Sequence, residues 1–190
     1  NTQWALTAGG DCNPFDDEAP RQIALNPAES SIYVAGRYQS FALFGDTVIY
    51  GGCDSERDVF LARYDIDGSF AWARGIRGFE VFPQKFLLDD SENTWLFAHS
   101  RIGAAELQES PLIYASEGAF LAKFSSNGAI LSVERSMLKG KIEDAEWYGG
   151  GLLIGGSYGA QDSLWDIALD AGAAESCGFV AVIDSSGVAD

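Results

Sequence analysis

The segment Phe60-Leu-Ala-Arg-Tyr-Asp-Ile-Asp-Gly68 returns as Phe120-Leu-Ala-Lys-Phe-Ser-Ser-Asn-Gly128 and again as Phe179-Val-Ala-Val-Ile-Asp-Ser-Ser-Gly187. The first residues of the three copies are 60 and 59 positions apart. A fixed period of this size indicates a repeat architecture in which each unit is one supersecondary element. Each copy looks like a strand that enters a glycine-containing hairpin turn. We therefore expect three structural units.

Strand-like segments and turn residues recur in the same order within each unit. The strands predicted for the first unit are 21–25, 31–38, 58–64 and 69–77, and those for the second are 84–88, 93–101, 119–124 and 129–137. The third unit offers 144–148, 152–158 and 178–183. Asp67-Gly68 and Asn127-Gly128 predict two-residue hairpin turns, because these residues tolerate positive φ. The best helical signal, in 164–174, predicts one or two helical turns inside a loop.

The predicted fold is all-β, with propeller-type blades of four antiparallel strands in three repeats of about 60 residues. Residues 1–10 would form an outer strand of a preceding or closing blade, because Trp4-Ala-Leu-Thr-Ala-Gly-Gly10 resembles Trp72-Ala-Arg-Gly-Ile-Arg-Gly78. Blade 1 would span 11–78, blade 2 79–140, and blade 3 141–190 without most of its outer strand. Propellers usually have about four to eight blades. We therefore expect either further blades or a second copy of the chain to accompany these three.

Several segments of the first unit carry a resemblance to a known family. Ile32-Tyr-Val-Ala-Gly36, Phe44-Gly45, Asp58-Val-Phe-Leu-Ala-Arg-Tyr-Asp65 and Phe70-Ala-Trp-Ala73 resemble the bacterial β-propeller repeat family called SBBP. The first unit matches well, the third in part and the second least, since Ser132 stands where the first unit has Trp72. Members are typically secreted or cell-surface bacterial proteins, so the resemblance implies an extracellular or cell-envelope location. It implies little about activity, because function lies in loops rather than in the fold.

Composition and charge narrow the classes of partner. Apolar residues make up 47% of the 190 residues, enough for a packed core and too many for a disordered segment. The net charge of −16 repels nucleic acid phosphates and anionic membrane surfaces, so we expect neither partner. No stretch approaches the roughly 18 continuous apolar residues of a membrane span. The first residues also lack the basic and apolar regions of a signal peptide.

The long connections at one end of the predicted sheets are the expected place for a binding site. They carry Asp16, Asp17, Asp54 and Trp165, which we interpret as candidate ligand-binding residues. The indole of Trp165 could stack on a sugar ring. Another acidic group, Asp162, Asp166 and Asp170, is a candidate calcium site. Neither group has the spacing of an EF-hand. A solvated acidic loop without any cofactor is therefore the simpler interpretation.

The chain has three cysteines, an odd number that allows one disulfide and one free thiol. Cys12 and Cys53 both fall in long connections of the first unit, at the same end of the predicted sheets. We expect them to form a disulfide in an oxidising compartment. Cys177 would remain unpaired.

His99 is the only histidine, and we align it with Gly36 and Gly156 of the other units and interpret it as a structural strand residue. No G-x-S-x-G elbow or phosphate-binding loop accompanies it. We therefore expect a non-catalytic extracellular or cell-envelope scaffold or binding module, which contacts a protein or carbohydrate on the cell surface. Two alternatives stay open: a carbohydrate- or calcium-binding lectin-like propeller, and an enzyme with an acidic site in the long connections.

Overall fold

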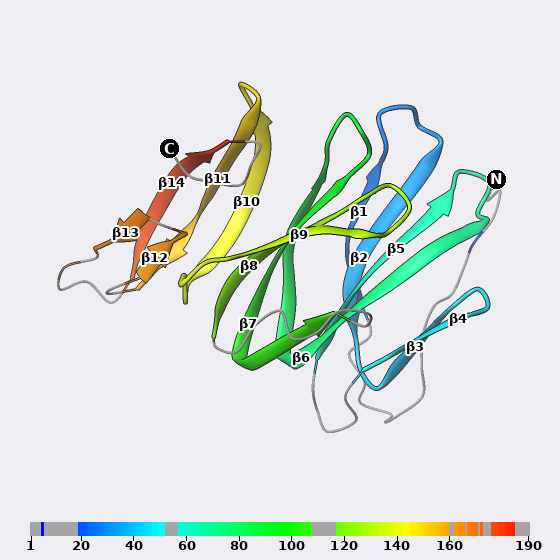
Figure 1. The fold of residues 1–190 in the computed structure, drawn as a ribbon, viewed down its shortest axis with the longest axis horizontal. Coiled ribbons are helices and arrows are strands. Elements are labelled where there is room, and N and C mark those ends of the chain that lie inside the picture. The colour runs from blue at the N-terminus through cyan, green and yellow to red at the C-terminus, as the bar shows by residue number, and fades with distance from the viewer. Residues whose placement is uncertain are drawn as a thin grey trace.

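The three repeats correspond to three groups of antiparallel strands in a computed structural model of the chain (Figure 1). The structure describes Ala5 and residues 19–51, 57–107, 117–159, 162–165, 167–170, 172 and 176–184. These residues form fourteen strands and no helix, so the prediction of an all-β chain is confirmed for them. Within the same ranges, no helix exists that could cross a membrane.

One long strand belongs to two groups at once. β6 (Phe70–Leu88) pairs through residues 70–76 with β5 (Asp58–Asp65) and through 76–88 with β7 (Thr94–Leu107). The seven-stranded sheet β1-β2-β5-β6-β7-β8-β9 is therefore two four-stranded meanders that share β6. We call β1, β2, β5 and residues 70–77 the first unit, and residues 78–88 with β7, β8 and β9 the second unit. The strands not yet defined are β1 (Ala19–Leu25), β2 (Ser31–Tyr38), β8 (Gly118–Phe124) and β9 (Ile130–Arg135).

The third unit is a separate sheet. It consists of β10 (Lys141–Tyr148), β11 (Gly151–Tyr158) and β14 (Cys177–Ile183), paired in that order. The strand order within each unit follows the chain, as the repeat predicts. One boundary differs from the prediction, because the last strand of the first unit and the first strand of the second are continuous. A register shift between Gly78 and Phe79 replaces the expected connection.

The repeat extends to irregularities in the strand pairing. The first strand of each unit contains one extra residue relative to its partner strand: Arg21, Gln84 and Glu143. The fourth strands of the first two units also have an extra residue after the hairpin, Ala71 and Leu131. A β-bulge bends its strand and increases the local twist. Bulges at matching places therefore give the units matching curvature.

Equivalent side chains close the turn between the first two strands of the first and second units. Asn26 Oδ1 accepts two backbone hydrogen bonds, at 2.8 and 2.9 Å, and Asp89 Oδ1 accepts two at 2.9 Å. Each turn also places a glutamate at positive φ, 53° for Glu29 and 60° for Glu92. Burial raises the pKa of Asp89, but its hydrogen bonds outweigh this effect and lower the pKa below its usual value. The turn thus keeps an ionised acceptor.

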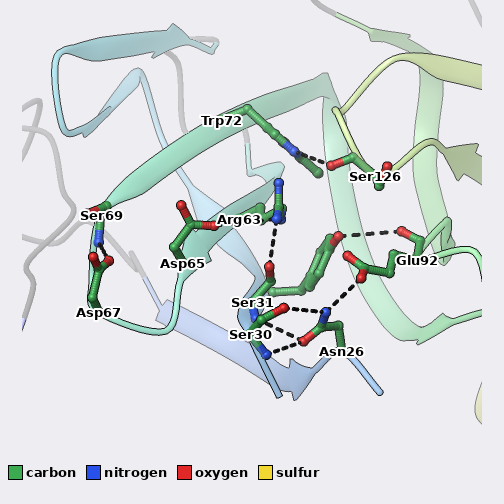
Figure 2. A network of polar contacts seen from close by, with 11 residues as sticks. Asn26, Ser30, Ser31, Arg63, Asp65, Asp67, Ser69, Trp72, Glu92 and Ser126 are labelled. Atoms are coloured by element: carbon green, nitrogen blue, oxygen red, sulfur yellow. Dashed lines mark hydrogen bonds and ion pairs between the residues drawn. The ribbon is translucent and has the colours of Figure 1, made fainter. Parts of the chain in front are cut away.

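Hydrogen bonds join the first and second units close to these turns (Figure 2). Asn26 Nδ2 donates to Glu92 Oε1 at 2.8 Å, and Trp72 Nε1 donates to the Ser126 backbone oxygen at 2.9 Å. The Trp72 ring also packs against Gly128, where a Cβ atom would lie 2.7 Å from the ring. Gly128 has φ +80°. The glycine of the repeated segment therefore serves both the turn and the contact between units.

The hairpins at the end of the repeated segment are wider than the two-residue turns predicted. Asp65 N donates to the Ser69 oxygen at 2.8 Å, and Gly68 N donates to the Asp65 oxygen at 2.9 Å. The same two bonds occur at Ser125 and Gly128. This is a tight turn followed by a glycine in the left-handed region, which matches the bulge found next to it.

Face-to-face packing of the units builds two hydrophobic clusters. The first cluster, with Tyr33 and Phe120, lies between the first and second units. The second cluster, with Leu121 and Leu152, lies between the second and third units. Successive residues of β8 thus point into opposite clusters, as strand geometry requires. Trp95 and Trp147 meet edge to face in the second junction, with ring centroids 5.4 Å apart.

Two short hairpins occupy connections predicted as loops. β3 (Phe41–Phe44) and β4 (Thr47–Tyr50) cover part of the outer face of the first unit, where the ring centroids of Phe44 and Phe60 are 5.0 Å apart. β12 (Asp162–Leu164) and β13 (Ile167–Leu169) contribute Leu164 to the second cluster. The helical prediction for 164–174 is therefore wrong. Both hairpins lie at the lower side of Figure 1, opposite the β1–β2 and β10–β11 turns.

We expect Gly128→Ala to destabilise the protein more than Gly149→Ala. Both glycines have positive φ, +80° and +59°, so each alanine pays the backbone penalty of about 1–2 kcal/mol. Only Gly128 faces a ring at 2.7 Å, and overpacking adds about 1–3 kcal/mol. Urea unfolding of both variants measures the difference. Equal losses would show that the Trp72 contact carries no strain.

Candidate functional site

A cavity of about 660 Å³ opens where the second and third units meet. Its walls come from the middle of the second-unit part of β6, from β7, from the start of β10, and from the residues just before β8 and β10. Apolar walls are formed by Phe82, Pro83 and Ile142. Most of the lining residues lie in strands, and none of them was predicted to bind a ligand.

His99 forms part of this wall and is only 8% exposed. The strand register places it opposite Phe82 and Ala119, whereas Gly36 pairs with Phe60 in the first unit and Ala98 with Phe120 in the second. The alignment of His99 with Gly36 is therefore wrong by one residue.

The cause of this error is the shorter turn of the second unit, which runs from residue 89 to 93 where the first unit has 26 to 31. A shift of one residue moves a side chain to the opposite face of its sheet. His99 follows Trp95 and Phe97 on the face that packs against the third unit. Its structural equivalent in the first unit is Arg37.

Burial lowers the pKa of the His99 imidazole below its usual value, although a hydrogen bond with the Lys139 backbone and the charge of Glu117 act in the opposite direction. The ring is therefore neutral at neutral pH. Its Nε2 atom is buried and has no hydrogen-bond partner. Buried polar atoms without a partner are rare in folded proteins, so this nitrogen marks the cavity wall as unusual.

The cavity gathers positive charge in a strongly acidic chain. Three of the twelve lysine and arginine residues line it, Arg101, Lys139 and Lys141. Arg101 Nη1 lies 3.2 Å from Glu80 Oε2, but Lys139 and Lys141 make no ion pair with a described residue. Two carboxylates, Glu117 and Glu143, line the same cavity. The walls thus offer cations, hydrogen-bond acceptors and apolar surface together.

Comparison of the two junctions gives a reason for the open space. At the first junction the Arg37 guanidinium lies over the Phe82 ring, 5.6 Å from its centroid. The strand register gives His99 and Lys141 the corresponding positions at the second junction. An imidazole is shorter than an arginine side chain, and a lysine offers no ring on which to stack. The volume occupied by the Arg37–Phe82 pair at one junction is therefore open at the other.

Glutamine side chains tie the units together at both junctions. Gln22 makes two hydrogen bonds with the Phe86 backbone, at 2.7 and 2.8 Å, across the first junction. Gln84 Oε1 accepts one from the Ile142 N–H across the second, at 3.3 Å. The longer bond lies in the cavity wall, because both residues line it. At the second junction this hydrogen bond is accompanied by an ion pair between Lys85 Nζ and Asp144 Oδ1, which are 2.6 Å apart.

The structure places only some of the residues predicted from the sequence. The candidate ligand residues Asp16, Asp17 and Asp54, the candidate metal ligand Asp166, and both Cys12 and Cys53 lie outside the described residues. Trp165 lies in the β12–β13 turn at φ 49°, is partly buried and packs against the second cluster. Its backbone N–H donates to Ser136 Oγ at 3.3 Å. It does not line the cavity at the second junction.

The acidic residues near β12 and β13 accept hydrogen bonds from nearby backbone N–H groups and do not form a shared cluster. Asp162 is buried and its Oδ2 accepts from the Gly159 N–H at 2.7 Å, while Asp170 Oδ1 accepts from the Gly172 N–H at 2.7 Å. Among the described residues, no three histidine, cysteine or acidic side chains come together in an arrangement suited to a metal ion. Cys177, on β14, is a free thiol.

Sequence reasoning missed the cavity for an identifiable reason. The prediction searched the acidic loops, whereas the cavity is lined by three basic residues that are scarce in this chain. Lys139 and Lys141 are close together in a chain with few basic residues, and this spacing could have indicated the site from the sequence. The position of His99 could not be predicted in this way, because it depends on the length of one turn.

No family model matches the sequence, and comparison with curated proteins gives no match.

We expect the stability of the protein to fall as the pH drops below about 6.5, and His99→Gln to reduce this loss. The folded pKa of His99 is lower than the unfolded value, so the unfolded state binds the additional proton in this window. The stabilising effect of the neutral imidazole is fully present above pH 6.5. Below this pH the free energy of unfolding falls by up to about 1.4 kcal/mol per pH unit. Urea unfolding at several pH values measures both proteins, and other titrating groups cancel in the comparison. Identical pH profiles would contradict the buried neutral state.

Proposed function

We propose that this chain is a propeller-type, non-catalytic binding module of the bacterial cell surface or extracellular space, which holds its ligand in the cavity between the second and third units. The single observation that carries the binding role is this cavity, in which a buried histidine lies among apolar walls, carboxylates and two lysines without an ion pair to any described residue. The location is supported by the resemblance to SBBP repeats and by the acidic composition.

The stacking of two four-stranded meanders and one three-stranded meander supports the propeller interpretation. Each unit packs a broad face against the next, with matching bulges and cross-unit hydrogen bonds. Both ends of the stack present uncovered apolar side chains. Ile23 and Leu25 are 69% and 51% exposed on the first unit, and Val180 is 77% exposed on the third. Further blades or a second copy of the chain would cover such rows.

The environment of His99 supports binding rather than catalysis. Nucleophilic catalysis requires a base within hydrogen-bond reach of the nucleophile that it activates. The chain has one histidine, and its Nε2 has no hydrogen-bond partner. A cavity whose histidine lacks such a partner fits the retention of a ligand better than its conversion.

The binding role predicts that small polar molecules perturb this cavity selectively. In an amide NMR screen of polar fragments, we expect chemical-shift changes to cluster at Gln84, His99 and Ile142. Lys141→Trp, at an exposed residue of the cavity rim, should abolish them by filling the space. Glu146→Trp places the same indole at an exposed position elsewhere on β10 and should leave them intact. If the same chemical-shift changes persist in the Lys141→Trp variant, the assignment of the site is contradicted.

The propeller proposal predicts concentration-dependent self-association of the isolated chain through its uncovered sheet faces. The outer face of the third unit presents Leu153, Val180 and Val182, and exposed sheet faces of this kind are interaction sites. We expect a V180K/V182K variant to shift sedimentation towards the monomer by about tenfold or more in concentration. Leu131→Lys, at a similarly exposed leucine of β9, is the control. A wild-type protein that stays monomeric at millimolar concentration would count against uncovered blade faces.

A further inference from the structure

We propose that the cavity between the second and third units binds an acidic saccharide through its carboxylate group, with Lys139 and Lys141 as the residues that recognise the charge. The inference rests on the proposed binding function and names the ligand class of that site. It follows from charge, hydrogen-bonding capacity and shape taken together.

The distribution of lysine partners identifies the charged part of the ligand. The chain has four lysines. Lys85 Nζ lies 2.6 Å from Asp144 Oδ1, and Lys123 Nζ lies 3.9 Å from Asp89 Oδ2 and over the Trp95 ring. The two lysines at the cavity have no such carboxylate among the described residues. Both lysines are exposed to solvent, so an anionic ligand can reach them, and a charge-assisted hydrogen bond is stronger than a neutral one.

The remaining polar groups of the cavity make a simple inorganic anion a poor ligand. Glu117 and Glu143 would repel an anion that has no hydrogen to donate. Hydroxyl groups donate to carboxylates and to the Gln84 carbonyl oxygen, so a polyhydroxylated ligand uses the acceptors as well as the cations. A neutral sugar would leave the lysines without a partner. A sugar that carries a carboxylate satisfies both sets.

The size and the apolar walls of the cavity agree with a ring-shaped ligand. A volume of about 660 Å³ lies within the range of about 300–1,000 Å³ of small-molecule sites, which is far larger than a single ion needs. Phe82, Pro83 and Ile142 offer apolar surface to the C–H groups of a sugar ring. The buried His99 beside them keeps this wall uncharged at neutral pH, so that the positive charge is confined to the lysines and Arg101.

The test is calorimetric titration of the full chain at low salt with α-1,4-linked digalacturonic acid and with its methyl ester. The ester keeps the rings and hydroxyl groups and removes only the charge. We expect the acid to bind at least about tenfold more tightly than the ester, because each charge-assisted bond adds about a factor of ten. Binding of the acid should weaken as sodium chloride is raised, whereas binding of the ester should not.

Matched variants assign the charge recognition to the cavity. Lys139→Gln and Lys141→Gln should each weaken binding of the acid by about tenfold and leave binding of the ester unchanged. Lys123→Gln removes the same charge outside the cavity and should leave both affinities within about twofold. Amide spectra of every variant establish that the fold is retained.

The outcomes separate this inference from the proposed function. Equal binding of acid and ester, or no effect of the two cavity lysines, overturns carboxylate recognition while the cavity stands as a site. Tighter binding of a zwitterion, with L-serine as the probe, overturns the saccharide assignment and points to the glutamates as ammonium ligands. If neither saccharide binds at millimolar concentration, the ligand class is wrong. Loss of every fragment signal at the cavity would remove the proposed function itself.

Discussion

The second unit is apolar on both faces, and this two-sided burial determines how the other units are placed. Phe120 and Leu121, neighbours on β8, are fully or almost fully buried in opposite clusters. A sheet of this kind cannot be stable with one face in water, so a sheet must lie on each side. Burial of each large side chain contributes roughly 1.5–3 kcal/mol. The first and third units provide this cover, and in doing so they leave their own outer faces only partly covered by β3–β4 or exposed.

The repeated segment was sufficient to predict the order of the strands within each unit. It repeats with its hairpin bonds, its glycine and its following bulge, all of which are local features of the sequence. The continuity of β6 and the hairpins β3–β4 and β12–β13 could not be predicted in the same way. They depend on contacts with other units, such as Phe44 against Phe60, which overrule weak local preferences. The one-residue offset at His99 has a similar origin in a single turn of different length.

The candidate site lies where two otherwise similar junctions of the repeat differ. The two junctions have the same strands, the same bulge positions and a glutamine bridge across each. They differ where Arg37 over Phe82 is replaced by His99 and Lys141. The sequence-based search concentrated on acidic loops because acidic residues are abundant, yet the informative residues were the scarce cations. In a chain of charge −16, a lysine without an ion pair to a described residue is a more specific indication of a binding site than another carboxylate.

The continuity of β6 divides the chain into two cooperative blocks of unequal size. The first and second units share one continuous strand, in which residues 70–76 pair with β5 and residues 76–88 pair with β7. The third unit joins them through the irregular segment 136–140, through side-chain packing and through side-chain polar contacts between β6 and β10. Local openings in proteins follow such contiguous blocks. The cavity lies on the seam between the two blocks, where a partial separation of the third unit would widen its mouth while the larger block stayed intact. Entry and release of the proposed ligand would then depend on this boundary, which no strand ladder crosses among the described residues.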